Sequence, residues 1–97
     1  MTDKQLKRYL GQCLKEKRIA ADLSQEDIAK VIKLSRVSVL NMESGRHTPS
    51  LLTLMLLCGL YKCTYNDILP PVEAVKFEIK EEVVMIKKKR KVLRLVK

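Results

Sequence analysis

One short run of residues carries side chains that can read the edges of DNA base pairs. Arg36, Val37 and Asn41 lie on the outer side of a segment that is predicted to be helical. Arginine can form two parallel hydrogen bonds with guanine, asparagine can do the same with adenine, and a valine methyl can contact the methyl group of thymine. Ser38 and Leu40 share this outer side. The interpretation depends on the elements around the run, which must hold the helix at an exposed surface.

Two short helices joined by a tight turn are predicted over residues 24–43. Ser24 and Asp27 have the spacing of a capping box, in which each side chain bonds a backbone N–H at the start of a helix. Ser35 is placed to cap the second helix, and Lys33 lies in the turn. Apolar residues recur at helical spacing on the inner side of the pair, at Ile28, Ala29, Ile32, Val39 and Met42. One side of the second helix is therefore free to face a partner.

Three further helices complete a small all-α domain of five helices. They are predicted over residues 2–21, residues 49 or 50 to 61, and residues 65–69. The first begins with a Thr2–Gln5 capping box, and Asp22 follows its end because aspartate tolerates a left-handed backbone. Gly45 suits the end of the second helix of the central pair. We expect this domain to occupy residues 1–71.

The predicted helix that ends at residue 61 is apolar on two sides. One row suffices for a core stripe and comprises Leu51, Leu54, Met55 and Cys58. A second row, at intervals of four residues, comprises Leu52, Leu56 and Leu60. A helix that is apolar on two faces is usually buried on two faces. We therefore expect the second row to pack on a second subunit or under the C-terminal segment.

The overall charge and the rare residue types argue against several kinds of site. The chain has 97 residues, a net charge of +9, three cysteines and one histidine. The cysteines form no close pair of the kind that structural zinc sites use, and His47 lies in a polar loop. No glycine-rich phosphate loop occurs. We expect a non-enzymatic protein without a metal or cofactor, with a polyanionic partner and a cytoplasmic location, since no signal peptide is predicted.

Four short motifs occur in an order and spacing that resemble the Cro and phage-repressor (Xre-type, lambda-repressor-like) helix-turn-helix family. They are LSQEDIA at residues 23–29, LSR at 34–36, MESGR at 42–46 and TPSL at 48–51. The resemblance covers residues 10–69 and implies a DNA-binding domain of a bacterial or phage regulator, with residues 35–44 as the recognition helix. Asp22 and Lys33 stand where this family commonly has glycine, so both positions need a positive φ or an altered turn.

The resemblance also implies roles for individual residues. Gln25 matches a glutamine that binds a phosphate and braces the recognition helix, and Arg46 matches a loop that holds phosphates. Arg18 and Glu43 match a partly buried ion pair between the first helix and the end of the recognition helix. The base-facing positions correspond to Arg36, Val37 and Asn41. The full predicted DNA-binding set comprises Gln25, Lys33, Ser35, Arg36, Val37, Ser38, Asn41, Arg46 and Thr48.

The C-terminal segment, residues 72–97, lies outside the resemblance. It holds nine lysines or arginines against four glutamates and includes KKKRK at residues 87–91. Alternation over residues 74–80 and β-branched residues near 83–86 and 92–96 favour two or three strands, which two subunits could pair into one sheet. Helical spacing of apolar residues leaves a helix as the alternative. The basic run has three interpretations: an arm along the DNA backbone, a solvated charge run, or a nuclear-import signal.

The predicted function is sequence-specific DNA binding by a homodimer that regulates, and typically represses, transcription from a palindromic operator. One rival is an antitoxin that autoregulates its operon and binds a toxin enzyme through residues 72–97. A neighbouring toxin gene or a co-purifying second chain would identify it. Another rival is a protein–protein adaptor whose helix-turn-helix no longer binds DNA. Binding without salt dependence or sequence preference would support that rival.

Overall fold

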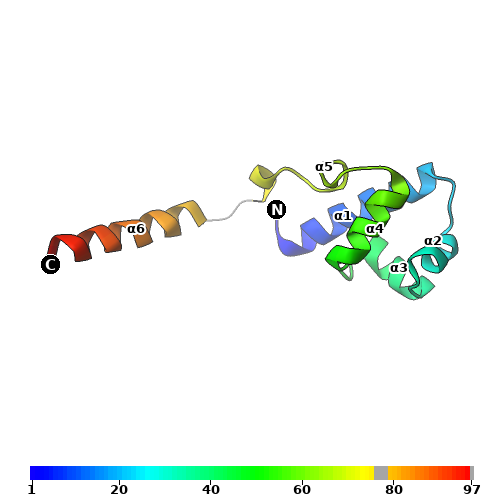
Figure 1. Cartoon of the computed structure of the whole chain (residues 1–97), viewed down its shortest axis with the longest axis horizontal. Helices are drawn as coiled ribbons and strands as arrows, with labels where there is room; N and C mark the ends of the chain where they lie inside the picture. Colours follow the sequence, from blue (N-terminus) through cyan, green and yellow to red (C-terminus); the bar gives the residue numbers. More distant parts are fainter. Residues whose placement is uncertain (76–78, 97) are drawn as a thin grey trace.

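The computed structural model describes residues 1–75 and 79–96, and it is all-helical over these residues. The elements are α1 (Asp3–Ala20), α2 (Gln25–Ile32), α3 (Arg36–Glu43), α4 (Leu51–Tyr61), α5 (Tyr65–Ile68), a single 3-10 turn (Val72–Ala74) and α6 (Ile79–Val96). Helices α1 to α5 form one body, and α6 extends away from it (Figure 1). None of the described helices combines the length and apolar content needed to cross a membrane.

Side-chain caps define where the helices of the body begin. The two predicted capping boxes, Thr2 with Gln5 and Ser24 with Asp27, are both present. The Ser35 hydroxyl accepts a hydrogen bond from the Ser38 backbone N–H, which confirms the predicted cap of α3. Helix α4 begins one residue later than the later of the two predicted starts, because the Ser50 hydroxyl caps it and leaves Ser50 itself outside the helix. The caps of α1, α2 and α3 are local interactions, so the sequence pattern was sufficient to locate them.

The turns that join the helices use left-handed residues. Asp22 and Lys33 both have φ +57°, and Gly45 has φ +80°. The requirement for a positive φ at the first two positions is therefore confirmed. Lys33 closes α2, and the backbone N–H of the next residue, Leu34, donates to the carbonyl of Ala29 at 3.0 Å. This short turn sets the angle at which α3 leaves α2.

The core lies where α1, α2, α3 and α4 meet, with one residue from α5. It comprises Leu10, Leu14, Ile28, Ala29, Ile32, Val39, Met42, Leu54, Leu57, Cys58 and Ile68. The predicted core stripe of α4 is partly wrong, because Leu51 and Met55 are exposed whereas Leu57 is only 2% exposed. Helix α4 is apolar on every side, so its sequence periodicity could not identify the inner face. Packing against the other helices selects that face.

A glycine allows α1 to pass directly over the end of α3. A Cβ atom built on Gly11 would lie 2.5 Å from the Met42 carbonyl oxygen and 2.6 Å from the Glu43 carbonyl oxygen. Glycine within a helix costs about 1 kcal/mol relative to alanine, so its presence at this buried position is explained by the close approach. This contact fixes the distance between α1 and the C-terminal end of α3.

The prediction of β-strands in residues 72–97 is wrong for the residues that the structure describes. Residues 79–96 form α6, and the described chain contains no strand; residues 76–78, part of the first predicted strand, lie outside the description. The apolar spacing fitted both periods, and the run after Pro71 has no glycine or proline to stop a helix. Lysine, glutamate, arginine and leucine also favour helices. The intermolecular sheet expected from these strands is therefore overturned as well.

Candidate nucleic-acid interface

Helix α3 presents opposite faces to the core and to solvent. Val39, Met42 and Glu43 are buried, whereas Arg36 and Val37 at its first turn are exposed. Because α3 is short and held on one side only, its exposed face can approach a groove without obstruction from its own core contacts. A helix that offers its N-terminal residues in this way has the geometry that major-groove readers use.

The predicted base-reading residues differ in how far they project. Val37 is 64% exposed, and Arg36 is exposed beside it. Asn41 and Ser38 are half-buried, and the Ser38 hydroxyl lies 2.9 Å from that of Ser35 within the cap. Leu40 is exposed between them and was given no role from the sequence. The most accessible surface of α3 is therefore its first turn together with Leu40.

The segments before and after α3 place additional polar groups at its two ends. Lys33 is exposed in the turn that precedes the helix. After the helix, the backbone N–H groups of Arg46 and His47 donate to the Asn41 carbonyl at 3.0 and 3.2 Å. These bonds fold the loop back against α3, and the side chains of Arg46 and Thr48 are exposed on it. One basic side chain thus lies at each end of the helix.

A network of three side chains ties α1, α2 and α3 together. Arg18 Nε donates to Glu43 Oε2 at 2.8 Å, Arg18 Nη2 donates to Glu43 Oε1 at 3.1 Å, and Gln25 Nε2 donates to the same Oε1 at 3.1 Å. Arg18 Nη1 also donates to the Leu23 carbonyl at 2.9 Å. The side chains of Arg18 and Glu43 are only 12% and 5% exposed. The hydrogen bond to Glu43 raises the pKa of Arg18, so the Arg18 guanidinium stays charged.

The network positions α3 more than it stabilises the fold. A buried ion pair loses most of its Coulomb energy to desolvation, and its net contribution can be close to zero. The network fixes the position of α3 relative to α1, because the bidentate contact from Arg18 orients Glu43 at the last turn of α3. Gln25 uses one of its two amide N–H groups in this network, and the other remains for a further acceptor.

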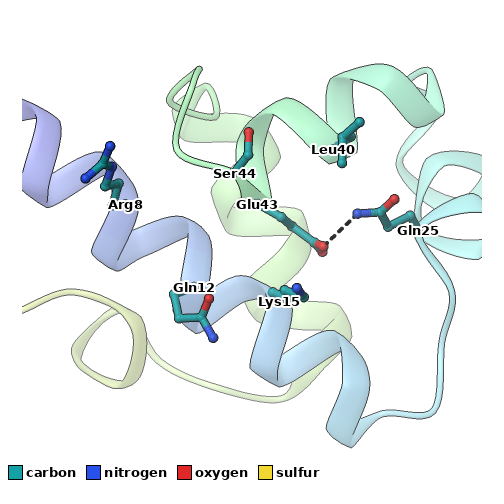
Figure 2. Close-up of a pocket in the computed structure, with 7 residues that line it drawn as sticks. All are labelled: Arg8, Gln12, Lys15, Gln25, Leu40, Glu43 and Ser44. Atoms are coloured by element: carbon teal, nitrogen blue, oxygen red, sulfur yellow. Dashed lines mark hydrogen bonds between the residues drawn. The ribbon is translucent and has the colours of Figure 1, made fainter.

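A cavity of about 420 Å³ opens between α1, the start of α2 and the outer side of α3. Figure 2 shows Arg8, Gln12 and Lys15 of α1 on one side, Leu40 of α3 and the following residue Ser44 on the other, and the Gln25–Glu43 hydrogen bond between them. Arg8 and Lys15 are exposed, and neither forms an ion pair with another of the described residues. The cavity is therefore a polar recess with positive charge at its edge, next to the exposed face of α3.

Sequence reasoning did not identify the contribution of α1 to this surface. Arg8, Gln12 and Lys15 are spaced at i, i+4 and i+7, so they share one helix face. That spacing indicates a continuous polar face on α1. The direction of that face depends on how α1 packs on α3, which the spacing alone does not determine.

The start of α2 carries an ionised cap. Hydrogen bonds from the backbone N–H and the hydroxyl of Ser24 lower the pKa of Asp27 below its usual value. A carboxylate at this position also interacts favourably with the positive end of the helix dipole. The cap fixes the first turn of α2, from which Gln25 reaches Glu43.

Among the residues that the structure describes, no group of three histidine, cysteine or acidic side chains could hold a metal ion.

Comparisons with known proteins agree with this arrangement. A family model described as helix-turn-helix, HTH_3, matches residues 14–68. The restriction-modification controller protein C.AhdI of Aeromonas hydrophila is 31% identical and superposes with a TM-score of 0.59, covering 64% of this chain and 94% of that one. No curated protein sequence matches the chain.

Two further solved structures share the fold at lower identity. The clp gene regulator ClgR of Corynebacterium glutamicum is 22% identical with a TM-score of 0.61, covering 65% of this chain and 81% of that one. The hypothetical transcription factor NHTF from Neisseria is 24% identical with a TM-score of 0.62, covering 77% of this chain and 87% of that one. At these identities the likeness establishes the fold alone.

Proposed function

The chain belongs to the HTH_3 family of helix-turn-helix proteins, and on that premise we propose that it is a DNA-binding transcriptional regulator. In detail, it represses transcription by binding a palindromic operator as a homodimer, with residues 35–44 in the major groove. The exposed first turn of α3 carries this proposal, because Arg36 and Val37 project from a helix whose other side is buried and braced. A restriction-modification controller of similar fold is consistent with a regulatory role.

Four side chains are assigned to the bases. Arg36 donates two hydrogen bonds to guanine O6 and N7, and Val37 contacts the methyl group of a neighbouring thymine. Asn41, half-buried one turn further along, pairs with adenine. Leu40 joins them as an apolar contact, since it is exposed on the same side of α3. Each well-formed bidentate contact is worth about 1–3 kcal/mol of discrimination against the wrong base.

Phosphate contacts are assigned to the residues around α3. Lys33 lies before the helix, and Arg46 and Thr48 lie in the loop after it. Gln25 has one free amide N–H, and the hydroxyl groups of Ser35 and Ser38 lie at the helix start. Each phosphate that a cation neutralises adds about 0.9 to the slope of log affinity against log salt. These residues therefore set the orientation of α3 on the DNA, whereas the side chains that contact the bases determine sequence specificity.

The outer face of α4 is assigned to the dimer. Leu51 and Leu52 are 70% and 67% exposed, and Met55 and Leu56 are exposed beside them. Helix α4 contains no charged residue, and uncovered apolar patches of this kind mark interaction sites. Leu60, the last residue of the predicted row, packs partly against the core. A second copy offers the same uncharged face, so a two-fold contact pairs like with like.

The decisive experiment is selection of bound duplexes from a random DNA pool. The proposal predicts an enriched sequence with two-fold symmetry and half-sites about one helical turn apart. Arg36→Ala should lower affinity for that sequence by about 1–3 kcal/mol, or roughly 5- to 150-fold, and relax the preference at one base pair. Lys4→Ala removes one exposed positive charge from α1 and is the matched control. A reporter with the selected site across its promoter then tests repression.

Three outcomes would each contradict a part of the proposal. Failure of the pool to yield any enriched sequence would exclude sequence-specific recognition. Equal loss of affinity in Arg36→Ala and Lys4→Ala would show that Arg36 acts only through its charge. An asymmetric enriched sequence would exclude the palindromic operator while leaving DNA binding in place.

A further inference from the structure

Helix α6 concentrates positive charge outside the part of the chain that the family model covers. The match ends at residue 68, and α6 begins at Ile79. Six basic side chains, all exposed, occur among eight consecutive residues: Lys87, Lys88, Lys89, Arg90, Lys91 and Arg94. No acidic residue follows Glu82. The helix therefore carries a charge that no described acidic side chain neutralises.

Four of these side chains share one face of α6. Lys87, Arg90, Lys91 and Arg94 recur at i, i+3, i+4 and i+7, and together they line a shallow groove. At 1.5 Å per residue, the six cations occupy about 10 Å of helix. Duplex DNA carries one negative charge per about 1.7 Å of axis, or about six charges over the same length. Counted around the whole helix, the linear charge density of α6 is thus close to that of a DNA duplex counted over both strands.

Two other occupants of this helix face are disfavoured by the positions of the charges. A second α6 would bring another six cations alongside, and like charges at that spacing repel. A helix lying on a membrane needs one continuous apolar face. In α6, Arg90 falls between Ile86 and Leu93 on one side, and Lys88 falls between Val84 and Val92 on another. A cation therefore interrupts both of these rows, and the remaining apolar patch, formed by Met85, Val92 and Leu93, is bordered by Lys88 and Lys89.

We propose that α6 is a second nucleic-acid contact, which lies along the sugar-phosphate backbone of double-stranded DNA beside the site that α3 reads. This inference rests on the proposed function and extends its footprint. The contact is independent of base sequence, because the four cations of this face are suited to phosphate oxygens, which carry no sequence information. The basic face from Lys87 to Arg94 spans about 10 Å, so each α6 can contact about three base pairs of flanking DNA.

The test compares two duplexes with the full-length chain. One contains only the operator selected from the random pool, and the other extends it by about ten base pairs of arbitrary sequence on each side. The variant changes Lys87→Gln, Arg90→Gln, Lys91→Gln and Arg94→Gln, since glutamine keeps helix propensity while removing charge. The matched control changes Arg90→Lys and Arg94→Lys, which retains all four charges. Circular dichroism verifies that both proteins keep their helix content.

The wild-type chain should bind the long duplex more tightly than the short one, and the neutralised variant should lose this preference. If each of the four cations contacts one phosphate, the slope of log affinity against log salt falls by about 3.6 per subunit. A dimer with one α6 on each flank therefore loses about 7.2 from the slope, so between about 50 and about 200 mM salt the wild type loses on the order of 10⁴-fold more affinity for the long duplex than the variant does. The lysine control should behave like the wild type.

Three results would overturn the inference, and each is distinct from failure of the proposed function. A neutralised variant that keeps the long-duplex preference shows that α6 does not contact the flanks. If the neutralised variant loses the same affinity for both duplexes, α6 acts through long-range electrostatic attraction and does not contact the flanking DNA. Wild-type protein that co-sediments with phosphatidylserine vesicles, with no preference for the long duplex, assigns α6 to a membrane surface. Absence of any enriched sequence in the pool would instead refute the proposed function itself.

Discussion

Replacement of the glycine at the crossing of α1 and α3 tests whether the recognition helix is held as the structure shows. Alanine favours a helix over glycine by about 1 kcal/mol, so helix propensity alone predicts that Gly11→Ala stabilises the protein. The structure predicts the opposite sign. The new Cβ would lie 2.5 Å from the Met42 carbonyl oxygen and 2.6 Å from that of Glu43. Both neighbours are backbone atoms, which cannot rotate away as a flexible side chain can.

The expected loss follows from these opposing terms. Overpacking of a tight contact costs about 1–3 kcal/mol and occasionally more, and a contact at 2.5 Å with backbone belongs at the upper end. After the gain in propensity is subtracted, we expect Gly11→Ala to lower the free energy of unfolding by about 2 kcal/mol. For a domain of this size, that corresponds to a fall of very roughly 5–20 °C in Tm. Separation of α1 from α3 would also disturb the Arg18–Glu43 pair.

Gly59 provides the matched control, because it also lies within a helix but a Cβ there meets nothing within 4 Å. We expect Gly59→Ala to raise the free energy of unfolding by about 0.5–1 kcal/mol. Urea unfolding followed by circular dichroism gives both values. A series of protein concentrations separates any dimer contribution, since Gly59 is on the exposed part of α4. If Gly11→Ala proved as stabilising as Gly59→Ala, the close approach of α1 and α3 would be refuted.

Three further predictions concern the Arg18–Glu43 ion pair, the cap of α2 and the exposed face of α4 that is assigned to the dimer. Glu43→Leu should destabilise the fold by about 3 kcal/mol in urea unfolding because it leaves Arg18 buried without its partner, and adding Arg18→Met should restore most of that loss. The pKa of Asp27 is lowered in the folded state, so its contribution to stability is present above about pH 4 and is lost as the pH falls through the folded pKa. Thermal melts from pH 2 to 6 should therefore show that the Tm of Asp27→Asn falls less steeply with acidification than the Tm of the wild type. Leu52→Lys should leave the helix content unchanged and shift the protein to monomers in sedimentation, and a dimer that survives this change would place the subunit contact elsewhere.

Much of the helix-turn-helix unit could be predicted from the sequence because its signals are local. The capping boxes at Thr2 and Ser24, the cap at Ser35 and the left-handed turns at Asp22 and Lys33 each depend on residues within a few positions of one another. The Arg18–Glu43 pair was expected from the family resemblance and is present at 2.8 Å. The DNA contacts of the exposed residues of α3 stay predictions until the binding experiments are done.

The sequence by itself determined where α1, α2 and α3 begin, where the chain turns between them, and where positive charge accumulates. Capping, φ preference and charge are properties of short stretches of chain. Only the tertiary structure decided which side of α4 is buried, since a helix that is apolar all round has no periodicity to distinguish its faces. It also decided that α1 turns Arg8 and Lys15 toward α3, and that Gly11 is needed at the crossing. The apolar spacing of the C-terminal segment fitted both a helix and a strand. The segment forms a helix because the described chain offers no partner strand and its helix-forming residues follow one another without interruption.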